Sequence, residues 1–172
     1  MKRRIFLAGA LALVVARHSD AWAKPSKYRL RGTSFECPLA LSKPLKVGLE
    51  ASSMGFPAQA QKAEFTILVC EFDKQGFALL KEAGMDPSEY AKTTYLGITK
   101  PATQKSTRKF AQGAQTGEVY PESFPNKDYL ETFWLERKGA GVMLAFRVSK
   151  SMPMQGANEA IDKICQTFEW KQ

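Results

Sequence analysis

Four glutamates in this sequence are candidates for acid-base catalysis because carboxyl groups can exchange protons with a substrate. Two facing carboxyl groups can act as general acid and base, as in glycosidases, if they converge in a cleft. The four glutamates in question are Glu118, Glu122, Glu131 and Glu136. Glu131 and Glu136 differ by an odd number of residues, so a regular strand points them to opposite faces. We therefore interpret these glutamates as exposed sheet charges, and a carboxylate-dependent hydrolase is the least favoured function.

Histidine chemistry is largely excluded. The one histidine, His18, lies in a segment that we expect to be removed on export. The remaining chain then lacks Ser-His-Asp or Cys-His catalysis and His-ligated zinc, copper or haem, although carboxylates or lysines alone can still catalyse. Met152 and Met154 flank Pro153, and thioethers suit Cu(I), but a Met-rich loop packed on a helix gives the same pattern. We predict no catalytic residue, no metal site and no cofactor.

The cysteines allow two interpretations. In an oxidising compartment Cys37, Cys70 and Cys165 can form at most one internal disulfide. Their spacing matches no C-x-x-C motif. Buried, inert thiols are slightly favoured. The alternative is a bridge between Cys37 and Cys165, which would tie the first strand to the last helix and add roughly 2 to 4 kcal/mol of stability.

A stiff aromatic segment offers a binding surface. Between Tyr120 and Tyr129, aromatic residues alternate with Pro121 and Pro125. The prolines keep the chain extended, so little ordering entropy is lost on binding, and aromatic rings give large contact areas. We predict that Tyr120, Phe124 and Tyr129 bind a partner. The alternative is that these rings only close the end of the core.

The elements that must position these residues are clearest between Lys127 and Lys150. Two apolar runs, Tyr129–Leu135 and Val142–Val148, flank the stretch RKGAG and predict a β-hairpin. Alternate residues of the second run form an apolar face, which fits a sheet covered firmly on one side. Those residues are Val142, Leu144, Phe146 and Val148.

A helix follows the hairpin and can cover it. Within the stretch 158–170, apolar residues recur at i, i+3, i+4 and i+7, so they share one face of a helix. Those residues are Ile161, Ile164, Cys165 and Phe168. Before the hairpin, the stretch 64–72, EFTILVCEF, is apolar on both faces and predicts a central strand, and the stretch 33–41 predicts a first strand.

Helix signals stand in the middle of the chain. Asp86 as N-cap, Pro87 at the first position and Glu89 three residues after the cap predict a helix that stops before Pro101. The polar stretches 24–31 and 100–109 are expected to be a loose leader and a solvated loop. The order of elements predicts an α+β fold, an α-β-α sandwich with a mainly antiparallel sheet and a C-terminal helix packed on it.

The N-terminus has the features of an export signal. Lys2-Arg3-Arg4 precedes an apolar run from Ile5 to Ala16, and Ala21-Trp22-Ala23 resembles a cleavage site. We predict a signal peptide at 1–23, cleaved after Ala23, and a single domain at 24–172. The Arg pair is compatible with the twin-arginine route or with the general secretory route. Twelve apolar residues are too few to span a bilayer, so no spanning helix is predicted.

The layout resembles the PsbP-like fold family, which includes PsbP photosystem proteins, Ran-binding Mog proteins and DcrB-type envelope proteins. The resemblance lies in the order and hydrophobic pattern of five stretches. They are SFECPLAL, EFTILVCEF, DPSEYAKTTYLGI, KDYLETFWLERKGAGVMLAFRV and NEAIDKICQTFEW. The resemblance implies a small non-enzymatic domain that binds or stabilises a protein partner, and it assigns no functional residue.

These observations lead to one main expectation for function. Removal of residues 1–23 leaves 21 basic and 16 acidic residues, a net charge of +5 that is spread rather than clustered. We expect an exported, non-catalytic protein of the periplasm or cell envelope, or a secreted one, that acts on a protein partner and associates at most peripherally with the envelope. Nucleic acid is not expected as a partner. The alternative is a carrier of a small apolar ligand or lipid held between sheet and helix.

Overall fold

The computed structural model describes residues 24–57, 63–120 and 128–171, which form antiparallel sheets and helices. In chain order the strands are β1 (Ser26–Leu30), β2 (Thr33–Cys37), β3 (Leu45–Lys46), β4 (Ala51–Phe56), β5 (Phe65–Phe72), β6 (Gln104–Phe110), β7 (Gly113–Tyr120), β8 (Tyr129–Arg137), β9 (Ala140–Val148) and β10 (Glu169–Trp170). The helices are α2 (Lys74–Glu82), α3 (Pro87–Leu96) and α4 (Met154–Thr167). This mixture confirms the predicted α+β class. The predicted signal peptide lies outside the described residues.

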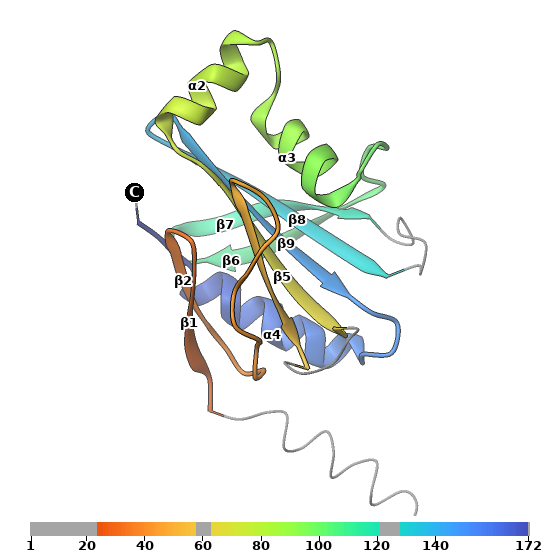
Figure 1. The fold of residues 1–172 in the computed structure, drawn as a ribbon. Helices are drawn as coiled ribbons and strands as arrows, with labels where there is room; N and C mark the ends of the chain where they lie inside the picture. Colours follow the sequence, from red (N-terminus) through yellow and green to blue (C-terminus); the bar gives the residue numbers. More distant parts are fainter. Residues whose placement is uncertain (1–23, 58–62, 121–127, 172) are drawn as a thin grey trace, which may run out of the picture.

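Seven strands form the main sheet, in the order β3-β4-β5-β9-β8-β7-β6, and every neighbouring pair is antiparallel. A smaller sheet has the order β1-β2-β10. Figure 1 shows α2 and α3 on one side of the main sheet and α4 on the other, with β1 and β2 beside α4. Helices therefore lie on both faces of the central strands.

The hairpin predicted between Lys127 and Lys150 is confirmed as β8 and β9. Arg137 pairs with Ala140, so the connecting turn has only two residues. Lys138 and Gly139 have φ angles of 51° and 76°. Two consecutive positive φ values are typical of the type I′ turn, whose twist matches that of the strands, and glycine at the second position suits it. The turn is tighter than the five-residue connection that the sequence indicated.

Strand β9 is buried on both faces. One face, which turns toward α4, carries Val142, Leu144, Phe146 and Val148, as the alternation predicted. The other face carries Met143 and Ala145 and packs against residues of α2 and α3. The sheet is thus covered on two sides and not on one, because α2 and α3 supply a second apolar layer.

Phenylalanine rings fill the space between the sheet and α4. Ring centroids lie 5.2 Å apart for Phe110 and Phe133, 6.3 Å for Phe133 and Phe146, and 6.1 Å for Phe110 and Phe168. These four side chains are at most 2% exposed. The four rings therefore contact one another in a chain at the centre of this layer, as expected for a closely packed protein interior.

The predicted cap of α3 is confirmed. The Asp86 carboxylate accepts a hydrogen bond from the backbone N–H of Glu89 at 3.0 Å, and Pro87 occupies the first helical turn. The helix ends at Leu96 and is followed by Gly97, with φ of 65°, so it stops before Pro101 as expected. A helix interior does not tolerate this left-handed conformation, which is a common C-terminal cap.

Two polar stretches that the sequence analysis placed in loops contain strands. Ser26–Leu30 forms β1, which pairs with β2, and Gln104–Phe110 forms β6, which pairs with β7. Both strands are paired on one side only, so most of their side chains face solvent and are polar. Charged side chains on such strands also discourage pairing with another chain.

The aromatic layer under α4 gives a prediction for stability. Replacing Phe133 by Ala should lower the free energy of unfolding by about 3 to 5 kcal/mol, because the substitution leaves a cavity beside Phe110 and Phe146. Leu79→Ala is the matched control, since Leu79 is 57% exposed, and should change stability by about 0.5 kcal/mol or less. Urea unfolding followed by circular dichroism measures both; equal effects would contradict the packing described.

Candidate functional site

Two of the three predicted binding residues, Tyr120 and Tyr129, lie in different parts of the core. Tyr120 is 3% exposed and belongs to the cluster under α2 and α3, whereas Tyr129 is half-buried and packs against the cluster under α4. Their hydroxyl groups donate to Glu118 and Glu131 respectively. Phe124 lies outside the described residues. The two tyrosines therefore close the end of the core on opposite faces of the sheet, and Tyr120 is not accessible to a partner.

Glu131 corrects the expectation of exposed sheet charges, because its side chain is fully buried. Arg108 donates to both of its carboxylate oxygens, at 3.1 and 2.8 Å. The same guanidinium donates to Asp162 at 2.9 Å and to Asn158 at 2.8 Å on α4. This network joins β6, β8 and α4 through a buried bidentate pair, which the glutamate spacing could not reveal. Glu136, by contrast, is exposed as expected.

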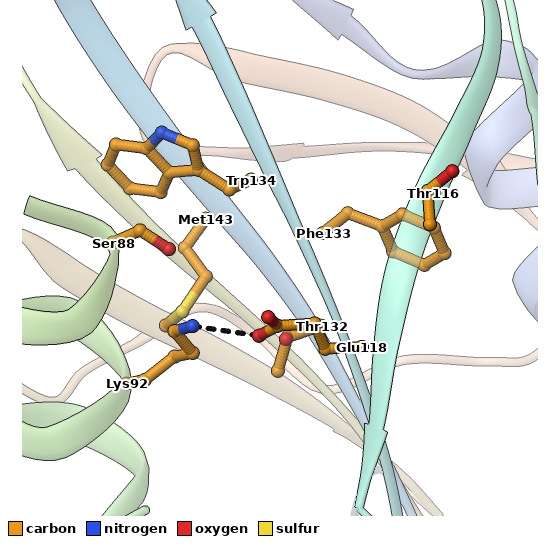
Figure 2. Close-up of a pocket in the computed structure, with 8 residues that line it drawn as sticks. All are labelled: Ser88, Lys92, Thr116, Glu118, Thr132, Phe133, Trp134 and Met143. Atoms are coloured by element: carbon orange, nitrogen blue, oxygen red, sulfur yellow. Dashed lines mark hydrogen bonds and ion pairs between the residues drawn. The ribbon is translucent and has the colours of Figure 1, made fainter. Parts of the chain in front are cut away.

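A second polar group lies on the other face of the sheet, beneath α3. A pocket of about 130 Å³ separates this helix from β7, β8 and β9. Its lining residues are Ser88, Lys92, Thr116, Glu118, Thr132, Phe133, Trp134 and Met143. Figure 2 shows Lys92 reaching from α3 toward Glu118 on β7, with Met143 beside it. A space of this size suits a few water molecules and is smaller than most ligand sites, which measure roughly 300 to 1,000 Å³.

Lys92 is the centre of this polar group. Its side chain is 6% exposed, and its ammonium donates to Glu118 at 2.7 Å and to Glu89. Burial acts to lower the pKa of this ammonium, but the hydrogen bonds to Glu118 and Glu89 outweigh burial and raise it above the usual range. Lys92 therefore stays protonated. Ser88 lies one helical turn earlier and lines the same pocket, but a protonated lysine cannot serve as its general base.

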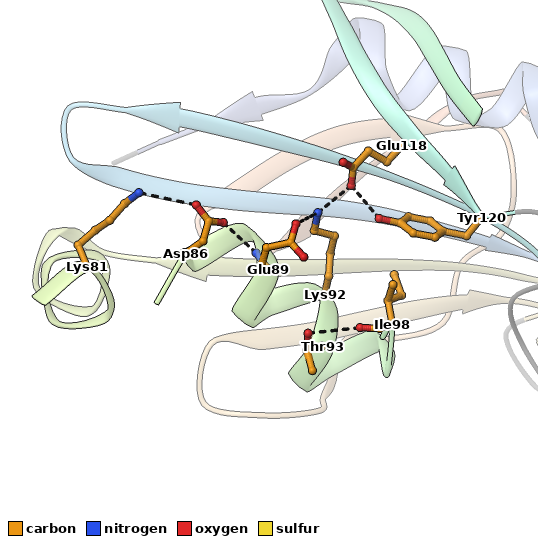
Figure 3. A network of polar contacts seen from close by, with 8 residues as sticks. All are labelled: Lys81, Asp86, Glu89, Lys92, Thr93, Ile98, Glu118 and Tyr120. Atoms are coloured by element: carbon orange, nitrogen blue, oxygen red, sulfur yellow. Dashed lines mark hydrogen bonds and ion pairs between the residues drawn. The ribbon is translucent and has the colours of Figure 1, made fainter. Parts of the chain in front are cut away.

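The network extends from Lys92 in both directions (Figure 3). Glu118 accepts a hydrogen bond from the Tyr120 hydroxyl at 2.7 Å, and Lys81 of α2 lies 3.7 Å from the Asp86 carboxylate. Burial and the bond to Glu118 raise the pKa of Tyr120 to about 12. Burial acts to raise the pKa of Glu118, but its bonds with Lys92 and Tyr120 lower it. Each cation thus faces at least one carboxylate, and the ion pair between Lys92 and Glu118 ties α3 to β7 of the sheet.

An apolar groove lies beyond the end of α3. It measures about 190 Å³, and we call it the α3 groove. Its lining residues are Ser53, Thr66, Leu68, Tyr95, Leu96, Leu130, Ala145 and Arg147. Leu45 pairs directly with Ser53, and directly opposed residues share a face of the sheet, so Leu45 borders this groove. The groove opens to solvent next to a strand at the edge of the sheet.

Three exposed apolar side chains follow one another at alternate positions, beginning with Leu45 beside the groove. Leu45, Val47 and Leu49 are 64%, 44% and 77% exposed, and we call them the Leu45 surface. The loop that carries them is held against α3, because the Tyr95 hydroxyl donates to Glu50 and the Tyr95 ring leaves no room for a Cβ at Gly48. This surface was not found from the sequence. The signal available was the recurrence of an apolar residue at every second position, at Leu45, Val47 and Leu49.

All three cysteines are free thiols buried in the core, so the bridge between Cys37 and Cys165 is not formed in this structure. Each is at most 1% exposed. Burial raises the pKa of the Cys37 and Cys70 thiols to about 12 and raises that of Cys165 further. Because the thiolate is the reactive form, these cysteines are inert while the protein is folded.

In the ranges 24–57, 63–120 and 128–171, no helix is both long and apolar enough to cross a membrane. Over the same ranges, no three histidine, cysteine, aspartate or glutamate side chains are grouped so that they could hold a metal ion. Met152, one of the two methionines considered for Cu(I), is 7% exposed and packs in the core under α4.

Comparisons with known proteins give no family. No protein-family model matches the sequence, and no curated protein matches it. A crystal structure from Bacteroides thetaiotaomicron VPI-5482 is similar, with a TM-score of 0.44 and 14% identity over 88% of this chain, which spans about half (49%) of that one. Protein PA94 of unknown function from Pseudomonas aeruginosa has a TM-score of 0.39 and 16% identity, covering 83% of this chain and 96% of its own. Neither likeness is strong enough to support an argument about function.

The lowered pKa of Glu118 predicts a pH dependence of stability. The stabilisation from this carboxylate is complete above its unfolded-state pKa and is lost as the pH falls through its lower native pKa. Between pH 7 and about 3, unfolding free energy should therefore fall less in Glu118→Gln than in the wild type. At pH 7 the substitution should cost about 1 kcal/mol or less, because Glu118 is 42% exposed.

Glu136→Gln is the control for this measurement, since Glu136 is exposed on the neighbouring strand β8. Its acid profile should follow that of the wild type in urea unfolding at each pH. If Glu118→Gln and Glu136→Gln lose equal stability on acidification, the ion pair with Lys92 does not contribute in solution.

Thiol titration tests the state of the cysteines. Residues 24–172, purified under oxidising conditions, should react with a thiol reagent very slowly when native, because each thiol is buried and protonated. In denaturant, without reductant, all three cysteines should react. A single reactive thiol after denaturation would show that one disulfide had formed and would favour the alternative bridge.

Proposed function

We propose that the chain is an exported, non-catalytic domain of the periplasm or cell envelope that binds a protein partner, and that its layers are an α-β-α sandwich of the PsbP-like kind. The signal-peptide pattern at residues 1–23 supports export. Helices α2 and α3 on one face of the sheet and α4 on the other support the sandwich. The partner contact is assigned to the α3 groove and the Leu45 surface.

One observation carries the assignment of partner binding. The Leu45 surface exposes three branched apolar side chains within five residues, and it borders a groove that is itself lined by Leu68, Leu96 and Tyr95. Exposed apolar residues that occur singly are ordinary, but three within five residues, the first of them beside a groove, are a feature of protein interfaces. Tyr95 is anchored to Glu50, so the loop needs little ordering when a partner binds.

The size and lining of the groove favour a protein segment as its occupant. About 190 Å³ accommodates one or two apolar side chains, such as those on an extended or helical segment of a partner. The layer between sheet and α4, where an apolar ligand would have been carried, is instead filled by contacting phenylalanine rings. This packing removes the main support for a carrier of that design.

The charged groups also support a non-catalytic role. Lys92 is held protonated by two carboxylates, and the Glu131 carboxylate is engaged by Arg108 and Tyr129. These groups lie on opposite faces of the sheet, so they cannot act on one substrate. Both are arranged as cross-links between elements. Catalytic turnover by the purified protein would overturn this part of the proposal.

Crosslinking in the source organism tests the proposal. A photoactivatable amino acid in place of Leu49, which is 77% exposed, should give one discrete protein adduct in the envelope fraction. Adding Leu45→Asp should reduce that adduct about ten-fold or more, because the substitution puts a charge in the apolar contact. Circular dichroism of the purified variant checks that it folds.

Leu79 provides the matched control, because it is a leucine 57% exposed on α2, an element that contributes no residue to the Leu45 surface or the α3 groove. The crosslinker in place of Leu79 should not give the same adduct, and Leu79→Asp should leave the adduct from position 49 unchanged. Equal adducts from both positions, or none from position 49, would contradict partner binding at this surface.

A further inference from the structure

Another surface depression lies where β5 leads into α2, beside β10. It measures about 480 Å³, within the range of roughly 300 to 1,000 Å³ that small-molecule sites occupy. Its lining residues are Glu71, Phe72, Asp73, Lys74, Gln75, Ala140, Trp170 and Lys171. We call it the Trp170 depression. Most of its exposed lining is apolar, although its rim carries charges.

The Trp170 ring is a fixed wall of this depression. Its indole N–H donates to the Glu71 carboxylate at 2.7 Å, and the other oxygen of that carboxylate accepts from the backbone N–H of Gly32 at 3.0 Å. Arg31 lies 3.8 Å from the same carboxylate. The ring is thus held in place before any ligand arrives, and the negative charge of Glu71 is already matched.

The remaining charges at the rim favour an anion. Asp73 accepts a hydrogen bond from the backbone N–H of Gly76 at 2.8 Å, so this carboxylate caps α2. Lys74 and Lys171 are exposed, and within the described residues neither forms a salt bridge. The acids are therefore engaged by the protein, whereas two cations at the rim are available.

We propose that the Trp170 depression binds a single-chain amphipathic anion, namely an aliphatic carboxylate. The hydrocarbon chain lies along Trp170 and Ala140, and the carboxylate is held by Lys74 and Lys171. Burial of alkyl surface supplies the affinity, and the lysines select an anionic head group over a neutral one. The site is independent of partner binding, because it shares no residue with the α3 groove or the Leu45 surface.

The fluorescence of Trp170 gives a direct test. In residues 24–172 the tryptophans are Trp134 and Trp170, so Trp134→Phe leaves Trp170 as the single reporter. Sodium decanoate, kept below its micellar concentration at neutral pH, should change the emission of this protein in a saturable way. The alcohol 1-decanol has the same chain without the charge and should bind more weakly.

Substitutions separate the roles of charge and cavity. Lys74→Gln with Lys171→Gln should weaken decanoate binding about ten-fold and leave decanol binding unchanged, because two cation contacts are lost. Lys100→Gln with Lys109→Gln is the control, since these exposed lysines lie on a different part of the chain. Gln75→Phe should abolish binding of both compounds, because Gln75 is an exposed residue that lines the depression and a ring there would fill it.

Calorimetric titration of the unsubstituted protein with decanoate repeats the measurement without relying on the Trp134→Phe variant. Saturable binding that Gln75→Phe removes, with the stated preference for decanoate, supports the proposal. Three outcomes would overturn it: no saturable binding of decanoate, equal affinity for decanoate and decanol, or undiminished binding by the Gln75→Phe variant. Loss of the Leu49 crosslink described above would leave these results unaffected.

Discussion

The burial of β9 on both faces is the constraint on which the rest of the structure depends. Nearly every residue from Ala140 to Val148 is buried, so neither side of this strand can face water. Two covering layers must therefore exist, one formed by α4 with the smaller sheet and one formed by α2 and α3. An ion pair lies in each layer. Arg108 binds Glu131 on one face of the sheet, and Lys92 binds Glu118 on the other. Apolar burial stabilises the layers, and the ion pairs define the position of α3 and α4 on the sheet.

The sequence predicted the elements whose signals are local. The β8–β9 hairpin, the Asp86 cap and the apolar stripe of α4 each depend on residues within a few positions of one another. Strands β1 and β6 escaped prediction because an edge strand exposes most of its side chains and is defined by backbone pairing with a neighbour. The buried state of Glu131 was equally out of reach, since it depends on Arg108, 23 residues earlier, being brought across β7.

The candidate surfaces also depend on residues that are distant in the chain, which the sequence pattern does not reveal. Tyr120 and Tyr129 drew attention because aromatic residues near prolines are typical of interfaces, yet both hydroxyl groups serve the internal networks. The Leu45 surface and the Trp170 depression gave little local signal. Each arises where segments far apart in the chain meet, Glu50 with Tyr95 of α3 in one case and Trp170 with Glu71 in the other. Surface chemistry of this kind is a property of the fold and cannot be read from spacing alone.

The buried thiols have a consequence for the timing of folding. Once β2, β5 and α4 are assembled, Cys37, Cys70 and Cys165 are sealed in the core. Before that point they are accessible to any oxidant, and thiol–disulfide exchange is then governed by exposure. Folding and oxidation are therefore competing reactions, and a chain that reaches an oxidising compartment unfolded must form its core before its sulfurs are paired. In the folded protein, burial alone protects the three thiols from oxidants.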